Sequence, residues 1–218
     1  MSKLYEHQSS HQKISVWEND GVRSLYLDDD LQFDDNNELD VHQAFLTPLI
    51  PYTNLNDKDV LIIGGGDGGM ARTTLAWYPD AKITQCELDP KVVEVSVKYF
   101  PKLNHEGRVF DYIDKLVYGD GIKFIEQCII DDRQFDTVIL DLTVGTMIPF
   151  KQLKRITKNV SFFISYKSIE QFDLNIFGLF EDYQAEVVKI TGYHNDSIIF
   201  CAGQFKTKSL YNQMKKLL

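Results

Sequence analysis

The chain has 218 residues, of which 44% are hydrophobic and 25% charged, proportions that exclude a disordered or fibrous protein. Its formal net charge of −9 argues against a partner with a phosphate backbone, so we expect no nucleic-acid binding. No apolar run approaches the roughly 18 residues needed to cross a bilayer, which argues against a membrane helix.

The first 57 residues are strongly acidic: 11 acidic and three basic side chains give −8 of the net charge of −9. Such a surface raises the local concentration of a cationic small molecule, although a merely soluble surface would have the same composition. We expect strands over 12–17 and 22–27, turns at Asn19-Asp-Gly and Asp28–Asp30, and a helix over 41–49 capped by Asp40. Residues 1–57 are thus expected to form a small β-rich domain with a connecting helix.

Residues 58–218 show a different pattern, in which short apolar strands alternate with helices. The expected strands span 60–63, 82–87, 114–118, 135–141, 160–166, 185–190 and 197–205. The expected helices span 68–77, 90–99, 121–128, 149–157, 169–180 and 206–218. Strands without polar alternation, separated by helices, are typical of a parallel sheet covered on both faces. The expected fold class is therefore α/β, with a mostly parallel sheet closed by an antiparallel C-terminal hairpin.

The strongest local signal is a glycine-rich turn, Gly64-Gly-Gly-Asp-Gly-Gly, which follows a buried strand and opens a helix. Such a turn lets a ligand approach backbone N–H groups and the helix N-terminus. Glu87 ends the next strand, about 20 residues on, where a carboxylate can accept from both ribose hydroxyls. Asp120 ends the strand after that, where it can accept from an adenine amino group. Three successive strand ends therefore predict an adenosine site, in preference to acids that merely cap helices.

Asp67 indicates which adenosine ligand the turn would hold. It places a negative charge within the glycine turn, where it would repel a pyrophosphate, and no Walker-type Lys-Ser/Thr follows the glycines. An acid at this position suits a ligand with a positive charge near the ribose, such as a sulfonium with an ammonium arm. Two unit charges about 4 Å apart interact by about 4 kcal/mol at an effective dielectric of about 20, which is enough to select the sign of the ligand's charge.

Several motifs occur together in a specific order. They are the glycine turn, Cys86-Glu-Leu-Asp, Gly119-Asp-Gly and Val138-Ile-Leu-Asp, with His11-Gln12-Lys-Ile, Leu27-Asp-Asp-Asp-Leu-Gln32 and Glu38-Leu-Asp-Val-His42-Gln upstream and Ile190-Thr-Gly-Tyr193 near the end. In this order and spacing they resemble the polyamine aminopropyltransferases, the spermidine and spermine synthases. The resemblance covers about residues 10–205, and it implies a Rossmann-like, methyltransferase-type sheet in residues 58–218.

The resemblance implies a donor site for decarboxylated S-adenosylmethionine, a co-substrate and not a permanently bound cofactor. The residues implied to bind it are Gln12, His42, Gly64, Gly65, Gly66, Asp67, Glu87, Asp120 and Gly121. Of these, Glu87 would hold the ribose, and Asp120 with Gly121 the adenine. Asp67, helped by Gln12 and His42, would hold the aminopropyl arm and its terminal ammonium.

On the acceptor side, the resemblance implies that Asp141 is the base for the attacking amine and that Tyr193 lines the amine channel. The sequence departs from the family pattern here. The family motif Asp-Ser/Thr-Ser/Thr-Asp-Pro reads Asp141-Leu-Thr-Val144-Gly, so a second acid is replaced by Val144. The family's Tyr before His42 is Val41. Both changes make the acceptor side more apolar and remove a contact to an ammonium.

The expected activity is aminopropyl transfer to a diamine, most simply putrescine, giving spermidine and methylthioadenosine. Two alternatives stay open: a methyltransferase that uses intact S-adenosylmethionine, and a catalytically impaired module that binds a nucleoside or polyamine. The resemblance also implies a homodimer or homotetramer assembled through the N-terminal strands. Three widely spaced cysteines predict neither a disulfide framework nor a clustered zinc site, so we expect no bound metal and a reducing, cytoplasmic compartment.

Overall fold

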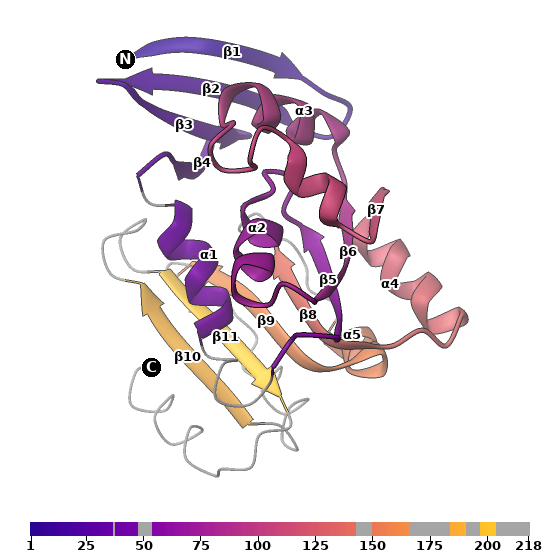
Figure 1. Ribbon diagram of the computed structural model, residues 1–218. Coiled ribbons are helices and arrows are strands. Elements are labelled where there is room, and N and C mark those ends of the chain that lie inside the picture. The colour runs from indigo at the N-terminus through magenta and orange to yellow at the C-terminus, as the bar shows by residue number, and fades with distance from the viewer. Residues whose placement is uncertain (37, 48–53, 143–149, 166–183, 191–196, 204–218) are drawn as a thin grey trace.

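A computed structural model describes residues 1–36, 38–47, 54–142, 150–165, 184–190 and 197–203, and the structural statements below refer to these residues (Figure 1). The expected helices over 169–180 and 206–218, the hairpin turn with Tyr193, and Val144 lie outside them. None of the helices described combines the length and apolar character that a bilayer-spanning segment requires.

The N-terminal residues form a four-stranded antiparallel sheet in the order β1-β2-β3-β4. Its strands are β1 (Ser2–Gln8), β2 (Lys13–Asn19), β3 (Val22–Leu27) and β4 (Asp30–Asp34). The strands expected over 12–17 and 22–27 are confirmed, but β1 and β4 were not predicted. The turn expected at Asp28–Asp30 is only two residues long: Asp28 and Asp29 have φ of 49° and 68°, as a tight hairpin requires, and Asp30 already begins β4.

The remaining strands form a seven-stranded sheet in the order β10-β11-β9-β8-β5-β6-β7. They are β5 (Asp59–Gly64), β6 (Lys82–Glu87), β7 (Lys115–Tyr118), β8 (Phe135–Asp141), β9 (Thr157–Ser165), β10 (Gln184–Ile190) and β11 (Ser197–Gly203). Strands β9, β8, β5, β6 and β7 pair in parallel, whereas β11 pairs antiparallel with both β9 and β10. The predicted fold class is confirmed.

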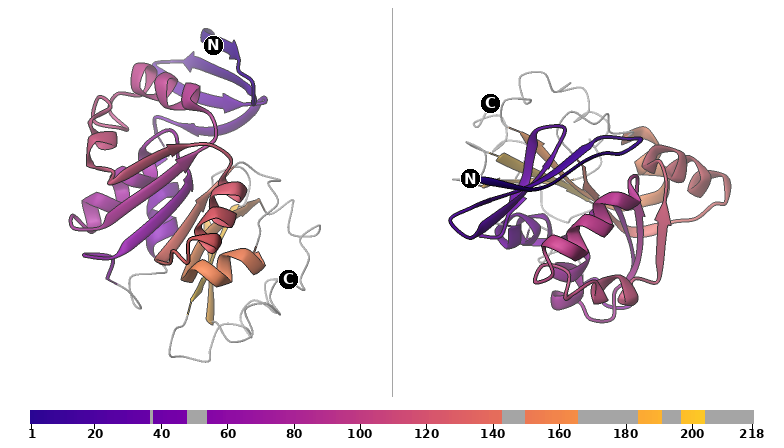
Figure 2. Two further views of the ribbon diagram at one scale, coloured as in Figure 1. Left: turned by 90° about the vertical axis from the view of Figure 1, so that its right-hand side faces the viewer. Right: turned by 90° about the horizontal axis from the view of Figure 1, so that it is seen from above.

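Helices cover both faces of this sheet (Figure 2). They are α1 (Glu38–Leu46), α2 (Gly69–Trp77), α3 (Pro90–Tyr99), the 3-10 helix η2 (Arg108–Tyr112), α4 (Gly121–Ile130) and α5 (Phe150–Ile156). Helices α1 and α2 pack together on one face, and α4 and α5 on the other. The helix expected over 41–49 begins earlier, at Glu38, and the helix expected over 149–157 ends at Ile156, because Thr157 already pairs with Phe135 as the first residue of β9. Helix η2 was not predicted.

The two sheets are joined through α3. Ile14, Val16, Leu25 and Phe33 of the small sheet form one buried apolar cluster with Val92, Val95, Phe100 and Leu103, in and just after α3. Phe33 meets Phe100 edge-on, with ring centroids 4.9 Å apart. The small sheet therefore rests on the helix that follows β6, close to the carboxyl ends of the parallel strands.

Strand order places a switch point next to β5. From β5 the chain moves through β6 to β7 on one side, and then returns to add β8 and β9 on the other side. In open α/β sheets, ligands bind beyond the carboxyl ends of the strands at such a reversal. The residues that follow β5, β6, β7 and β8 are the ones singled out by the sequence.

Candidate active site

The turn between β5 and α2 approaches β8 so closely that its first residue has to be glycine. Gly64 has φ of +87° and pairs with Asp141, and a Cβ built on it would lie 1.9 Å from the backbone oxygen of Asp141. No L side chain fits there, because both the dihedral angle and the contact exclude it. The glycine turn is therefore held against the end of β8.

Gln85, on β6, binds the backbone of this turn. Its side-chain nitrogen Nε2 donates to the carbonyl oxygens of Gly64 at 3.1 Å and Gly65 at 2.7 Å. The side chain is fully buried, and its oxygen Oε1 has no hydrogen-bond partner among the described residues. Gln85 was not predicted as a site residue, because the sequence does not show which backbone groups a polar residue inside a buried strand will contact.

Glu87 ends β6 and lies under the same turn. Its Oε2 accepts from the backbone N–H of Gly66 at 3.0 Å, and its Oε1 accepts from that of Asp89 at 2.8 Å. Burial raises the pKa of Glu87 to about 7, although the two N–H groups act in the opposite direction. Each carboxylate oxygen has a second lone pair, so the side chain can still accept two hydroxyl groups from a ligand.

Asp120 and Gly121 begin α4 after β7. The Asp120 Oδ1 accepts from the backbone N–H groups of Ile122 at 2.8 Å and Lys123 at 3.3 Å, so this side chain is the N-cap of α4. Asp120 therefore does cap a helix, which was the alternative interpretation of the acids at the strand ends. The same residue also lines the cavity described below. A Cβ on Gly121 would come within 2.4 Å of the Ile63 side chain, which explains why glycine follows the cap.

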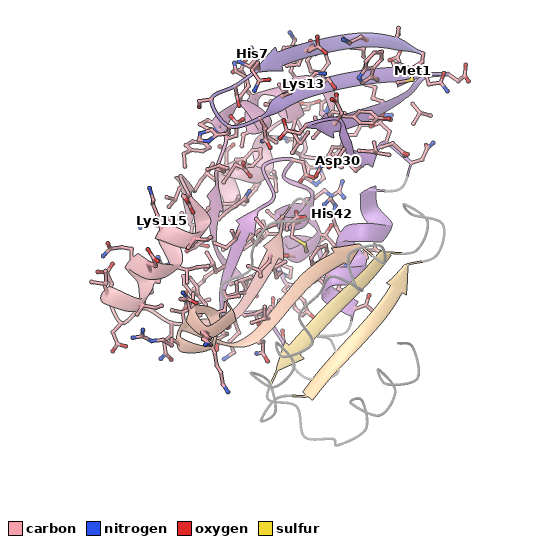
Figure 3. The ribbon with its side chains drawn as sticks, turned by 180° about the vertical axis from the view of Figure 1, so that it is seen from behind. Met1, His7, Lys13, Asp30, His42 and Lys115 are labelled. Carbon is pink, nitrogen blue, oxygen red and sulfur yellow. The ribbon has the colours of Figure 1, made fainter. Side chains whose placement is uncertain are left out.

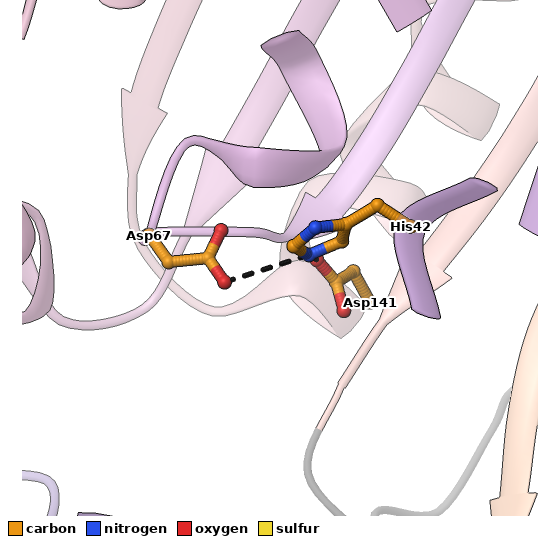
Figure 4. Close-up of side chains that lie close together, drawn as sticks. All are labelled: His42, Asp67 and Asp141. Carbon is orange, nitrogen blue, oxygen red and sulfur yellow. Dashed lines mark ion pairs between the residues drawn. The ribbon is translucent and has the colours of Figure 1, made fainter. Parts of the chain in front are cut away.

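His42, Asp67 and Asp141 converge from three different elements (Figure 4). The His42 Nε2, from α1, lies 3.6 Å from Asp67 Oδ2 and 4.0 Å from Asp141 Oδ2. Figure 3 shows His42 between the four-stranded sheet and the seven-stranded sheet. A Cβ on Gly69 would lie 2.1 Å from the imidazole, so glycine at the start of α2 makes room for the ring. One ligand-type atom from each of the three residues lies within 4.8 Å of the others, a spacing that suits a cation, whether a metal or an organic ammonium.

The two carboxyl groups of this cluster have opposite pKa shifts. Burial raises the pKa of Asp141 to about 7, and the negative charge of Asp67 adds to the effect. The Asp141 Oδ2 has no hydrogen-bond partner among the described residues. Burial also acts to raise the pKa of Asp67, but the charge and hydrogen bond of His42 and the backbone N–H of Gly69, 2.7 Å away, outweigh it and lower that pKa. The pair thus combines a permanent anion with a group that can take up a proton near neutral pH.

The carboxyl groups and the imidazole described above all line one cavity of about 330 Å³. Its lining includes every described residue that the sequence analysis proposed for the site: Gln12, His42, Gly64, Gly65, Gly66, Asp67, Glu87, Asp120, Gly121 and Asp141. Tyr193 lies outside the described residues. The arrangement offers a nucleoside-sized volume with anionic groups spaced along it.

Other residues line this cavity and were not proposed as site residues. They include Leu25, Leu27 and Phe33 of the small sheet, Gln32 of β4, and Leu88, which follows Glu87 and is 42% exposed. A leucine between two acids directly after a predicted strand was a usable signal, because ligand pockets are lined mainly by apolar side chains. Cys86 also lines the cavity, but burial raises the pKa of its thiol to about 12, so it stays protonated.

Comparison with known proteins gives a consistent result. Residues 40–212 match the family model described as the spermine/spermidine synthase domain. The chain is 38% identical over 143 residues to a polyamine aminopropyltransferase of Pectobacterium atrosepticum, covering 64% of this chain and 47% of that protein. It is 34% identical over 149 residues to one of Pyrococcus abyssi, covering 65% and 50%. The chain thus spans about half the length of the curated relatives it matches.

Solved structures with the same fold include a spermidine synthase from Thermotoga maritima, with a TM-score of 0.75 and 23% identity over 93% of this chain and 72% of that one. A spermidine synthase in complex with the transition-state analogue AdoDATO gives a TM-score of 0.76 and 24% identity over the same fractions. Together with the strand order, these likenesses establish the architecture around the cavity.

Proposed function

This chain belongs to the spermine/spermidine synthase family, and we propose that it transfers an aminopropyl group from decarboxylated S-adenosylmethionine to a diamine. We propose putrescine as the acceptor, with spermidine and methylthioadenosine as products. The observation that carries the proposal is the convergence of His42, Asp67 and Asp141 beside the glycine turn, in the cavity that Glu87 and Asp120 also line.

The donor's two positive charges fit the charge pattern of the cavity. Glu87 at one end of β6 would accept from the ribose hydroxyls, and Asp120 would receive the adenine amino group. Asp67 keeps its negative charge because its pKa is lowered, so it would attract the terminal ammonium of the aminopropyl arm. Intact S-adenosylmethionine carries a carboxylate near that ammonium, which Asp67 would repel.

The transfer step is an in-line displacement that needs a neutral amine. The amine nitrogen attacks the arm carbon next to sulfur, the C–N bond forms, and the C–S electron pair leaves with neutral methylthioadenosine. An alkylamine with a lysine-like pKa of about 10.4 costs roughly 4–5 kcal/mol to deprotonate at pH 7. Asp141 would take that proton, and its pKa of about 7 is well placed for a base near neutrality.

Positioning supplies the other part of catalysis. The sulfonium is already a good leaving group, so holding the amine in line with the C–S bond is the main remaining requirement. The acceptor proposal includes Tyr193 as a lining residue of the amine channel. Val41 and Val144 replace polar family residues, so we propose an acceptor side that is more apolar and offers fewer contacts to an ammonium.

The direct test is a donor-and-acceptor panel read by mass spectrometry. Purified protein should release methylthioadenosine and an aminopropylated amine when it is given decarboxylated S-adenosylmethionine and putrescine. Methylated amine formed from intact S-adenosylmethionine would instead identify a methyltransferase. Donor binding by calorimetry without release of methylthioadenosine from any diamine would identify a binding module that has lost the transfer step.

We further propose that residues 1–57 act as a small domain in front of a catalytic domain over residues 58–218, and that the protein assembles as a homodimer or homotetramer. The outer edge of β1 supports the second point, since six of the seven residues of β1 are exposed. Light scattering coupled to size exclusion should give a mass of two or four chains, and a monomer at micromolar concentration would contradict the proposal.

A further inference from the structure

We infer that Ser9 is a positioning residue for the donor: its hydroxyl, bound to Asp89, holds Gln12 in place where it lines the cavity. The inference rests on the proposed function, because it concerns how that donor is held. Nothing in the sequence pattern of the turn between β1 and β2 points to Ser9, which lies 80 positions away from the residue that it contacts.

The Ser9 hydroxyl organises the turn that leads into Gln12. Its oxygen accepts from the backbone N–H groups of His11 and Gln12, each at 3.0 Å, and the backbone N–H of Ser9 donates to the Gln12 carbonyl at 3.0 Å. These three bonds fix the backbone of Gln12 relative to Ser9. Any contact that holds Ser9 in place therefore also holds the start of β2 in place.

The hydroxyl has one hydrogen, and its geometry shows where that hydrogen goes. The Ser9 Oγ lies 2.6 Å from Asp89 Oδ2 and 3.0 Å from the Gln12 carbonyl oxygen. A short contact to a carboxylate is the stronger, charge-assisted bond, so the hydroxyl donates to Asp89. Asp89 is 2% exposed, which shields this bond from competition by water.

Asp89 is itself held by Glu87 and by the start of α3. Its Oδ1 accepts from the backbone N–H of Lys91 at 3.0 Å and so caps α3, and its own N–H donates to Glu87 at 2.8 Å. The Nε2 of Gln12 reaches the same Asp89 Oδ2 at 3.5 Å. A continuous path of hydrogen bonds therefore runs from the small sheet to the carboxylate proposed to hold the ribose.

The Gln12 side chain lies beside Asp89, whose backbone N–H donates to Glu87, so it would contact the nucleoside part that the donor shares with methylthioadenosine. A positioning role predicts weaker binding of both ligands with an unchanged kcat, which a general loss of structure would not give. Calorimetry on the full chain, with decarboxylated S-adenosylmethionine and methylthioadenosine as the two probes, should show that Ser9→Ala weakens binding of the donor by about fivefold to tenfold, the size of one lost hydrogen bond. Binding of methylthioadenosine should weaken by a similar factor, because it has the same nucleoside. In steady state, KM for the donor should rise while kcat stays the same.

Three further variants complete the test. Ser9→Thr keeps the hydroxyl and should restore most of the donor affinity, and Ser10→Ala, on the exposed neighbouring residue, should match the wild type in both affinities. In a Gln12→Ala background, Ser9→Ala should have no additional effect on donor affinity. Unchanged affinity for both ligands, or effects of the two substitutions that add, would overturn the inference.

The same experiment distinguishes this inference from the proposed function. If the wild type binds both ligands and Ser9→Ala binds both equally well, the positioning role is wrong while the donor site stands. If the wild type binds neither ligand, both the proposed function and the role of Ser9 are overturned. A melting curve for each variant confirms that affinities are compared between folded proteins.

Discussion

The two sheets meet at one cavity but contribute to it differently. The parallel sheet supplies charge, from the turns and strand ends that carry Asp67, Glu87, Asp120 and Asp141. The antiparallel sheet supplies amide and apolar side chains, namely Gln12, Leu25, Leu27, Gln32 and Phe33. Parallel strands bring their carboxyl ends to one edge, whereas an antiparallel sheet offers only the face that it buries.

This difference indicates a division of labour. The charged groups proposed to act on the donor and the attacking amine come from the ends of neighbouring strands of the parallel sheet. The antiparallel sheet lines the cavity with uncharged side chains, which would contribute to the fit of a ligand. Changes at the parallel strand ends should therefore affect turnover most, and changes in the small sheet should affect affinity or stability.

The largest effect is expected at Asp141, at the end of β8. Asp141→Asn removes the proposed base, and turnover should fall by a factor of about 100 or more, the scale of general-base catalysis. Affinity for methylthioadenosine should change little, because the donor's nucleoside contacts remain. Steady-state kinetics and calorimetry measure the two quantities.

Asp136→Asn is the matched control for this prediction, since Asp136 lies near the opposite end of the same strand and accepts from the backbone N–H of Asp59 at 3.1 Å. Its turnover should stay close to that of the wild type. Unchanged turnover in Asp141→Asn would show that the base lies elsewhere.

Gly69→Ala should have the next largest effect. The new methyl group would lie 2.1 Å from the His42 imidazole and has to displace it, which breaks the His42–Asp67 pair. Loss of a charge-assisted contact predicts about a tenfold or greater loss of donor affinity, and overpacking predicts a loss of about 1–3 kcal/mol of stability. Gly119→Ala is the control, because a Cβ there meets no atom within 4 Å. Equal behaviour of the two variants would show that His42 has no close packing requirement.

The pH profile should follow the raised pKa of Asp141. The base must be ionised, and burial raises its pKa to about 7, so kcat/KM should fall by about tenfold for each pH unit below about 7. The free amine adds a separate rise toward its own pKa of about 10.4. Residual activity of Asp141→Asn should lack the inflection near 7. A wild-type inflection near the ordinary carboxyl pKa of 3.8 would contradict the assignment.

The smallest effect is expected in the antiparallel sheet, at Arg23. Its Nη1 donates to the backbone oxygen of Tyr99 at 2.8 Å and so ties β3 to the end of α3. Arg23→Met should lower the free energy of unfolding by about 1 kcal/mol and leave kcat unchanged. Lys3→Met, which breaks the exposed pair with Glu6, should cost less than about 0.5 kcal/mol. Chemical denaturation measures both values. If Arg23→Met had a kcat as low as that of Asp141→Asn, the result would contradict the proposed division of labour between the two sheets.

The same contrast explains how much could be predicted from the sequence. The parallel strands and the acids at their ends were predicted from short apolar runs followed by glycine or acid, because a buried strand and its ligand-facing end are both local patterns. Strand β1 was missed, since most of its residues are exposed and so show no alternation of apolar and polar side chains. Helix η2 was missed because one short turn of 3-10 helix has no periodic pattern.

Within the site, the limits of prediction have one physical cause. Gln85 and Ser9 act through partners 20 and 80 positions away, and such contacts depend on how elements pack rather than on neighbouring residues. Gln12 and His42 were proposed only through the family resemblance, for the same reason. The pKa of Asp141 depends on its burial and on the nearby Asp67, which strand order alone brings together.

The burial of the Asp141 carboxyl group has a thermodynamic consequence for folding. A carboxyl group whose pKa rises from 3.8 to about 7 takes up a proton when the chain folds at intermediate pH. Its contribution to stability is therefore complete below about pH 4 and is lost as pH rises through about 7, while the lowered pKa of Asp67 acts in the opposite direction and favours the fold above about pH 4. Above neutrality, ionised Asp141 beside Asp67 thus disfavours the fold, and a cationic ligand should raise the melting temperature more at pH 8 than at pH 5.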